Sequence, residues 1–173
     1  AMSFGIGFST AITPLIAESD ARNDKNKTKS ILSNGIIICS ILGLILTALV
    51  LIFKPIIYYM GQPEIVVSLA YPYITLVAIS LFPLIIFQSF KQFSDGLSFT
   101  KIAMISTVIA NIINVVLNYI LIYGEFGFPR LELVGAGIGT LISRFIMVLL
   151  IIYLIKSNSC LLYTSPSPRD EKV

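Results

Sequence analysis

The stretch that decides the fold is residues 95–144, DGLSFTKIAMISTVIANIINVVLNYILIYGEFGFPRLELVGAGIGTLISR. It contains two strongly apolar segments joined by a short turn rich in Gly and Pro. Each segment is long enough to cross the hydrocarbon core of a bilayer, which takes about 20 residues. The stretch therefore predicts two transmembrane helices connected by a tight turn.

Polar residues recur inside these two segments at helical spacing. Asn111, Asn114 and Asn118 are spaced i, i+3, i+7, which places them on one face of a helix. Ala136, Thr140 and Arg144 are spaced i, i+4, i+8, again on one face. Polar groups within membrane helices usually face the interior of the bundle or a water-filled path. The pattern favours a membrane transport protein, or a piece of one.

Composition places the whole chain in the membrane. Of 173 residues, 56% are hydrophobic and only 12% are charged, whereas soluble domains carry about 25% charged residues. The fold class that this predicts is all-α and integral to the membrane. The net charge of +3 is small, and no nucleic-acid partner is expected.

The residues also argue against an enzyme. The chain has no His, so it contains no His-based catalytic triad, no imidazole zinc site and no His proton switch. Its two Cys residues cannot form a disulfide framework. No nucleophile–base pair or cluster of metal ligands is visible, and no cofactor is predicted.

Five membrane spans are predicted, at about residues 1–17, 31–53, 66–90, 102–123 and 133–155. The first is of marginal length, and because the chain is already apolar at its second residue we expect sequence to be missing upstream. Residues 18–29 are predicted to form a charged loop, and residues 91–101 a short turn. Pro72 and Pro83 lie inside the third span and predict kinks there.

Basic residues are distributed unevenly between the two sides of the predicted bundle. One side carries Arg22, Lys25, Lys27, Lys29, Lys91, Lys101 and Lys156, and the other only Lys54 and Arg130. Cytoplasmic loops are enriched in Lys and Arg. The first side is therefore predicted to face the cytoplasm. The helices between the two sides are predicted to lie in the lipid bilayer.

The last residues, 157–173, break the pattern. They contain two Ser-Pro pairs and mixed charges, and we predict that they are disordered. The run CLLYTSPSPRD, residues 160–170, looks like the in-frame translation of a sequencing-library adaptor. We interpret the tail from residue 160 as adaptor-derived, with the native protein continuing past about Ser159.

The string DGLSFTK…NIINVVLNYILIYGEFGFP…GAGIGT resembles the multidrug and toxic compound extrusion (MATE) family. The upstream pieces GFSTAITPLIAE and MGQPEIV agree with the second helix of that family and with the turn after its third. The resemblance implies a transporter of twelve helices in two lobes. Residues 1–156 would be helices two to six of the N-terminal lobe, with the first helix and the C-terminal lobe as missing partners.

The resemblance also implies a function and a site. MATE transporters are Na⁺- or H⁺-coupled antiporters that export drugs and other organic, often cationic, small molecules by alternating access, here from a bacterial inner (plasma) membrane. The family's cation site matches Asn114, Asn118, Thr140 and the carbonyl of Ala136, and its acidic residue lies on the first helix. Neutral oxygen donors suit a hard cation such as Na⁺. Many relatives have Asp at the position of Asn118, so the choice between Na⁺ and H⁺ stays open.

Two charged residues are candidates for coupling or charge pairing. Arg144 within a span costs at least about 2.5–3.5 kcal/mol on insertion scales; it is either a charge partner for the cation site or substrate, or a structural pair or snorkelling side chain. Asp95 with Gly96 predicts a turn and helix N-cap, with a possible part in coupling. Asn111 is expected only to form hydrogen bonds between helices.

Two other functions stay open at this stage. A flippase for lipid-linked saccharides, from a related family, shares the lobe architecture and predicts a cationic cavity, for which Arg144 is the only support. A non-transporting membrane scaffold would use the intramembrane Asn residues for packing alone.

Overall fold

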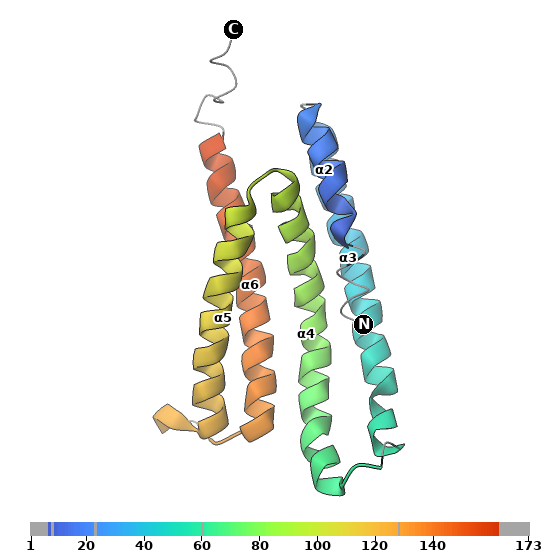
Figure 1. The fold of residues 1–173 in the computed structure, drawn as a ribbon, viewed down its shortest axis with the longest axis vertical. Coiled ribbons are helices and arrows are strands. Elements are labelled where there is room, and N and C mark those ends of the chain that lie inside the picture. The colour runs from blue at the N-terminus through green and yellow to red at the C-terminus, as the bar shows by residue number, and fades with distance from the viewer. Residues whose placement is uncertain (1–6, 8, 23, 60, 128, 163–173) are drawn as a thin grey trace.

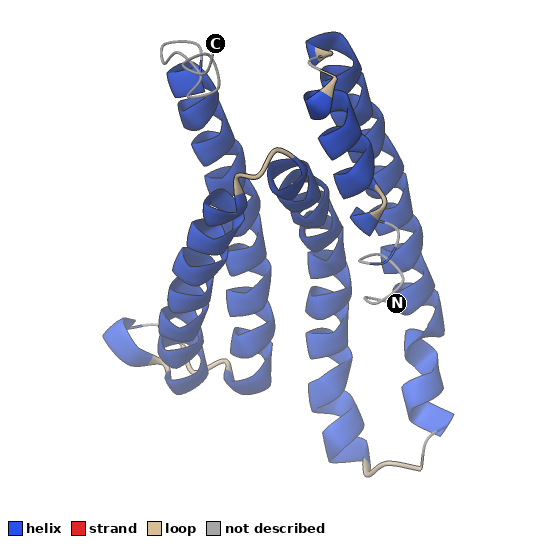
Figure 2. Cartoon of the chain, turned by 45° about the horizontal axis from the view of Figure 1, so that its top comes forward, coloured by secondary structure: helices blue, strands red, loops and turns tan. Residues whose placement is uncertain are grey.

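The computed structural model describes residues 7, 9–22, 24–59, 61–127 and 129–162, and these form a helical bundle (Figure 1). Its α-helices are α2 (Ile12–Ala21), α3 (Lys25–Phe53), α4 (Glu64–Gly96), α5 (Thr100–Tyr123) and α6 (Glu132–Leu162). Two short 3-10 helices, η1 (Lys54–Tyr59) and η2 (Glu125–Gly127), follow α3 and α5. The described residues include no strand (Figure 2). The predicted all-α fold is confirmed.

Four helical segments are long and apolar enough to cross a membrane: Asn26–Tyr59, Glu64–Gly96, Thr100–Tyr123 and Glu132–Ser157. They correspond to the second to fifth predicted spans. The first predicted span, residues 1–17, lies partly outside the described residues, and the 10 residues of α2 are too few to cross by themselves. Whether the chain crosses there stays a prediction.

The helices are longer than the sequence predicts, because they continue through charged residues. The predicted loop 18–29 is wrong: α2 runs to Ala21 and α3 starts at Lys25. The Asp24 carboxylate accepts a hydrogen bond from the backbone N–H of Lys27 at 3.0 Å and so caps α3. The predicted turn 91–101 is likewise too long, since α4 ends only at Gly96 and α5 starts at Thr100. Lys, Arg and Glu are good helix formers, so a helix that leaves the hydrocarbon need not stop.

The predicted disorder of residues 157–162 is also wrong. α6 continues to Leu162, because SNSCLL contains neither Gly nor Pro to end the helix. The remainder of the predicted tail, residues 163–173 with both Ser-Pro pairs, lies outside the described residues. Pro72 and Pro83 are both internal to α4, which continues past them as one helix.

The helices are arranged around α4 and α6. α6 packs against both α4 and α5, while α3 packs on the other side of α4 and α2 packs against α3 and α4. α4 and α5 contact each other much less, and they diverge away from the turn that joins them (Figure 1). α6, which packs against both α4 and α5, connects these two diverging helices.

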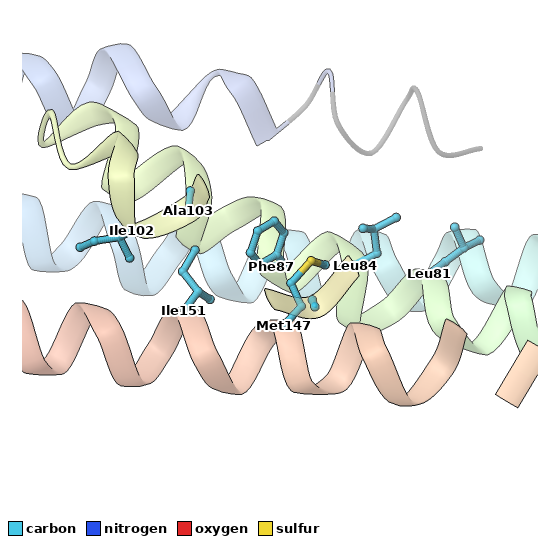
Figure 3. Packing of buried hydrophobic residues seen from close by; sticks show 8 residues of the cluster. Leu81, Leu84, Phe87, Ile102, Ala103, Met147 and Ile151 are labelled. Carbon is cyan, nitrogen blue, oxygen red and sulfur yellow. The ribbon is translucent and has the colours of Figure 1, made fainter. Parts of the chain in front are cut away.

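Two apolar clusters hold these contacts. The first joins α4, α5 and α6 through Leu81, Leu84, Phe87, Ile102, Ala103, Ala110, Met147 and Ile151 (Figure 3). The second joins α2, α3 and α4 through Ile12, Ile16, Cys39, Leu46 and Ile85. Large apolar side chains elsewhere are open to the surroundings, as Ile52 (70% exposed) and Ile65 (75%) show. Such a surface is expected of helices that face lipid.

Glycines of α6 let its backbone approach both neighbours. A Cβ at Gly135 would lie 2.6 Å from the carbonyl oxygen of Leu121 in α5, and one at Gly137 would lie 2.8 Å from Leu76 Cδ1 in α4. Because every other residue has a Cβ, only Gly permits this approach without a shift of the neighbouring helix or side chain. The small residues thus form two faces of α6, one for each neighbouring helix.

Candidate functional site

Asn114 and Asn118 lie on successive turns of α5 and pair with each other. The Nδ2 of Asn118 donates a hydrogen bond to the Oδ1 of Asn114 at 3.1 Å. The Oδ1 of Asn118 is buried and has no hydrogen-bond partner among the described residues. This oxygen lies against Gly139 of α6, where an added Cβ would collide with it. Burying an amide oxygen unsatisfied costs about 1–3 kcal/mol, so this acceptor is available for a ligand.

Thr140 and Ala136 lie on the adjoining part of α6. The Thr140 hydroxyl donates to the Ala136 carbonyl at 2.8 Å, which leaves the lone pairs of the hydroxyl oxygen free to accept. Gly139 precedes Thr140 and contacts Asn118, so the oxygen donors of α5 and α6 lie at the same level of the bundle. The structure therefore brings the four predicted cation ligands to one helix–helix interface.

A pocket of about 410 Å³ opens between α4, α5 and α6 next to this interface. It is lined by residues at helical spacing on each of the three helices: Leu84, Phe87, Gln88, Lys91, Thr107, Ala110, Asn111, Asn114, Thr140, Ser143, Arg144 and Met147. Four residues selected from the sequence, Asn111, Asn114, Thr140 and Arg144, line it together. Asn118 and Ala136 are not among its lining residues.

Arg144 reaches from α6 to α4. Its Nη1 donates to the Ser80 hydroxyl at 2.5 Å, and that hydroxyl donates to the Val77 carbonyl at 2.7 Å. Within the described part of the chain Arg144 has no carboxylate partner. The side chain is half-buried in the bundle. Among the described residues its hydrogen-bond partner is a neutral hydroxyl.

Asp95 does not occupy the position that the sequence predicts. It lies within α4, near the C-terminal end of the helix, and not in the connection between α4 and α5. Its carboxylate pairs with Lys91 Nζ at 3.1 Å. The N-cap of α5 is Phe99, which makes no side-chain capping bond, so the predicted N-cap role is wrong. Asp95 is not among the lining residues of the pocket, whereas Lys91 is.

The contribution of α4 to the pocket is not predicted from the sequence. Gln88 and Lys91 follow Leu84 at i+4 and i+7 on one face of α4. The Oε1 of Gln88 is buried without a partner among the described residues. The spacing is visible in the sequence, but the predicted turn at residues 91–101 includes Lys91 and so separates it from the helix face that carries Leu84 and Gln88.

Long apolar helices around a polar pocket define a multi-pass membrane protein. The comparison with protein families makes this specific. The family model described as MatE matches residues 1–120. The chain belongs to this family, the MATE transporters.

Curated relatives agree with this assignment. The chain is 30% identical over 155 residues to the multidrug resistance protein NorM of Vibrio cholerae, covering 90% of this chain and 34% of the relative. It is 34% identical over 153 residues to the probable multidrug resistance protein NorM of Photorhabdus laumondii, covering 87% of this chain and 34% of the relative. The chain thus spans about a third of the length of these relatives.

Solved structures share the arrangement of the helices. An inward-facing multidrug resistance MATE family transporter of the MOP superfamily matches with a TM-score of 0.79 and 25% identity, covering 88% of this chain and 34% of that one. A MATE structure in the bent conformation matches with a TM-score of 0.77 and 26% identity, covering 86% and 33%. The described helices therefore follow the MATE fold.

Proposed function

We propose that the transporter containing this segment exports drug-like organic compounds from bacterial cells as a cation-coupled antiporter. The relatives are named multidrug resistance proteins, and a polar pocket within a membrane bundle suits a transported solute. The proposed cycle is alternating access, in which cation and drug occupy the protein in different states. The membrane is the bacterial inner membrane, in keeping with the bacterial relatives.

The observation that carries this proposal is the unsatisfied oxygen of Asn118. Its Oδ1 is buried and unpaired among the described residues, and it lies at the level of Thr140, whose oxygen can also accept. A Na⁺ ion is bound by hard oxygen donors of this kind. Neither amides nor hydroxyls titrate near neutral pH, so a proton would need another group, such as a carboxylate outside this segment. The four residues therefore support Na⁺ better than H⁺.

The orientation follows from the ends of the helices. The α2–α3 and α4–α5 connections and the end of α6 lie at one end of the bundle, and η1 and η2 lie at the other (Figure 1). The first end carries most of the basic residues. By the positive-inside rule that end faces the cytoplasm.

The test is efflux by the full-length transporter in proteoliposomes under an imposed Na⁺ gradient. Asn118→Ala and Thr140→Val should raise the Na⁺ concentration for half-maximal efflux about tenfold or more, since a contact to a charged group contributes about 1.5–3 kcal/mol. Asn34→Ala is the matched control, because Asn34 is an exposed α3 residue whose side chain donates a hydrogen bond to the Ser30 hydroxyl of the same helix at 3.5 Å. An unchanged Na⁺ dependence in both site variants would refute the ion site, and efflux that ignores both Na⁺ and pH gradients would refute the antiport.

A further inference from the structure

Positively charged side chains line the pocket between α4, α5 and α6. A site that binds only cations has no need of them. Arg144 and Lys91 both line it, and no Asp or Glu of the described residues does. Asp95 offsets the charge of Lys91 from outside the pocket at 3.1 Å. Arg144 therefore gives the described lining of the pocket a net positive charge.

Arg144 has unused binding capacity. A guanidinium carries five N–H donors in a planar fork that matches a carboxylate. Its hydrogen bond to the described residues goes to the neutral Ser80 hydroxyl. Ser80 cannot neutralise the charge, because its hydroxyl is uncharged and donates its own proton to the Val77 carbonyl. A half-buried Arg in a membrane helix is stabilised by an anionic partner.

The rest of the lining suits the body of an organic molecule. Phe87, Met147 and Leu84 supply aromatic and apolar surface, and Asn111 and Gln88 supply amide groups. The volume of about 410 Å³ lies within the range of about 300–1,000 Å³ that is usual for small-molecule sites. Lys91 is 11 residues from Ser80 along α4, about 16 Å at 1.5 Å per residue, so Lys91 and Arg144 lie too far apart to hold one small anion together.

We propose that this pocket is a subsite for the carboxylate of a transported organic acid or zwitterion, and that the Arg144 guanidinium binds that carboxylate. The proposal rests on the proposed export function and limits the substrates of this pocket to organic compounds that carry a carboxylate. Lys91 adds positive charge at the other end of the pocket without touching the carboxylate. Phe87 and Met147 contact the apolar part of the same molecule.

The experiment compares two dyes that differ only in one group: a rhodamine with a free carboxylate, and its methyl ester. Transport of each is measured with the full-length transporter in proteoliposomes, and binding of each is measured by fluorescence polarisation of the detergent-solubilised protein. The variants are Arg144→Gln, which removes the charge, and Arg144→Lys, which keeps the charge but loses the fork. Arg130→Gln is the control, because Arg130 is an exposed turn residue whose ion-pair partner is Glu132 at 3.6 Å.

For the acid dye, Arg144→Gln should raise KM and Kd at least about tenfold, the effect expected for loss of a charged hydrogen-bonded pair. For the ester, both constants should change less than about twofold, and Arg144→Lys should lie between. Equal losses for acid and ester would overturn the proposal, because Arg144 would then pair with a carboxylate of the protein. Unchanged constants for both dyes would overturn it as well.

The binding measurement separates this proposal from the export function. If neither dye is transported but the acid dye binds in an Arg144-dependent manner, export fails and the subsite stands. If Arg144→Gln does not fold, a rise in the Kd of the acid dye alone in Arg144→Lys, relative to the unaltered protein, supports the subsite. An equal change in the Kd of both dyes, or no change in either, overturns it.

Discussion

Replacing Gly135 by Ala should force α5 and α6 apart. The added Cβ would lie 2.6 Å from the Leu121 carbonyl oxygen and 2.8 Å from its carbon, whereas ordinary contact begins at 3.4 Å. The same carbonyl accepts a hydrogen bond from the Leu131 N–H at 3.0 Å, so it cannot turn aside freely. The helices must separate by up to about 0.8 Å, and a gap of about 0.5–1 Å forfeits a quarter to a half of each dispersion contact.

Overpacking of this kind costs about 1–3 kcal/mol. Ala gains up to about 1 kcal/mol over Gly in helix propensity, so a matched Gly→Ala control is needed. Gly43 of α3 provides it, because a Cβ there would meet Phe82 Cδ2 at 3.4 Å, an ordinary contact distance. We expect Gly135→Ala to be less stable than Gly43→Ala by about 1–3 kcal/mol.

Equilibrium unfolding of the full-length transporter in mixed detergent micelles, followed by loss of helical circular dichroism, measures this difference. Gly43→Ala should equal or exceed the unaltered protein in stability, and Gly135→Ala should fall below it. Equal stability of the two variants would refute the close packing of α5 on α6 at this point.

Three further predictions follow from burial. Ile85 is fully buried, and Ile85→Ala should lower the free energy of unfolding by about 2 kcal/mol or more. This is the lower end of the range for such core changes, because the side chain is transferred from lipid and not from water. The same change at Ile52, which is 70% exposed, should have no measurable effect in the same unfolding assay. Ser80→Ala should cost about 1–3 kcal/mol by leaving the Arg144 guanidinium without its described acceptor; unaltered stability would show that Arg144 has a stronger partner elsewhere. Cys39, also fully buried, should react with a maleimide only on unfolding, and rapid labelling of the native protein in a mass-spectrometric time course would contradict the packing of α2 on α3 and α4.

The sequence predicts the existence of the long helices well but not their ends. Apolar runs of span length have no soluble alternative, so α3 to α6 follow directly from hydropathy. Helix ends depend on weaker effects, such as the single Asp24 cap and the tolerance of helices for Lys and Glu. These effects extend α4 to Gly96 and α6 to Leu162, beyond the predicted spans.

The candidate site likewise has a part that the sequence predicts and a part that it does not. The spacing of Asn114 and Asn118 follows from helix geometry alone, and their pairing at 3.1 Å needs no other element. The partner of Arg144 is Ser80, 64 residues away in the sequence, and no local pattern connects the two. Contacts between helices depend on their relative rotation and height, which hydropathy does not determine.

The divergence of α4 and α5 from their common turn has a mechanical consequence. The turn at residues 97–99 is short, and α5 beyond it has 24 residues, a rod of about 36 Å at 1.5 Å per residue. A pivot of about 5° at that turn would therefore carry the far end of α5 sideways by about 3 Å, given this length. A small change of angle near the basic end would thus become a movement of about 3 Å, roughly the width of a water molecule, at the other end.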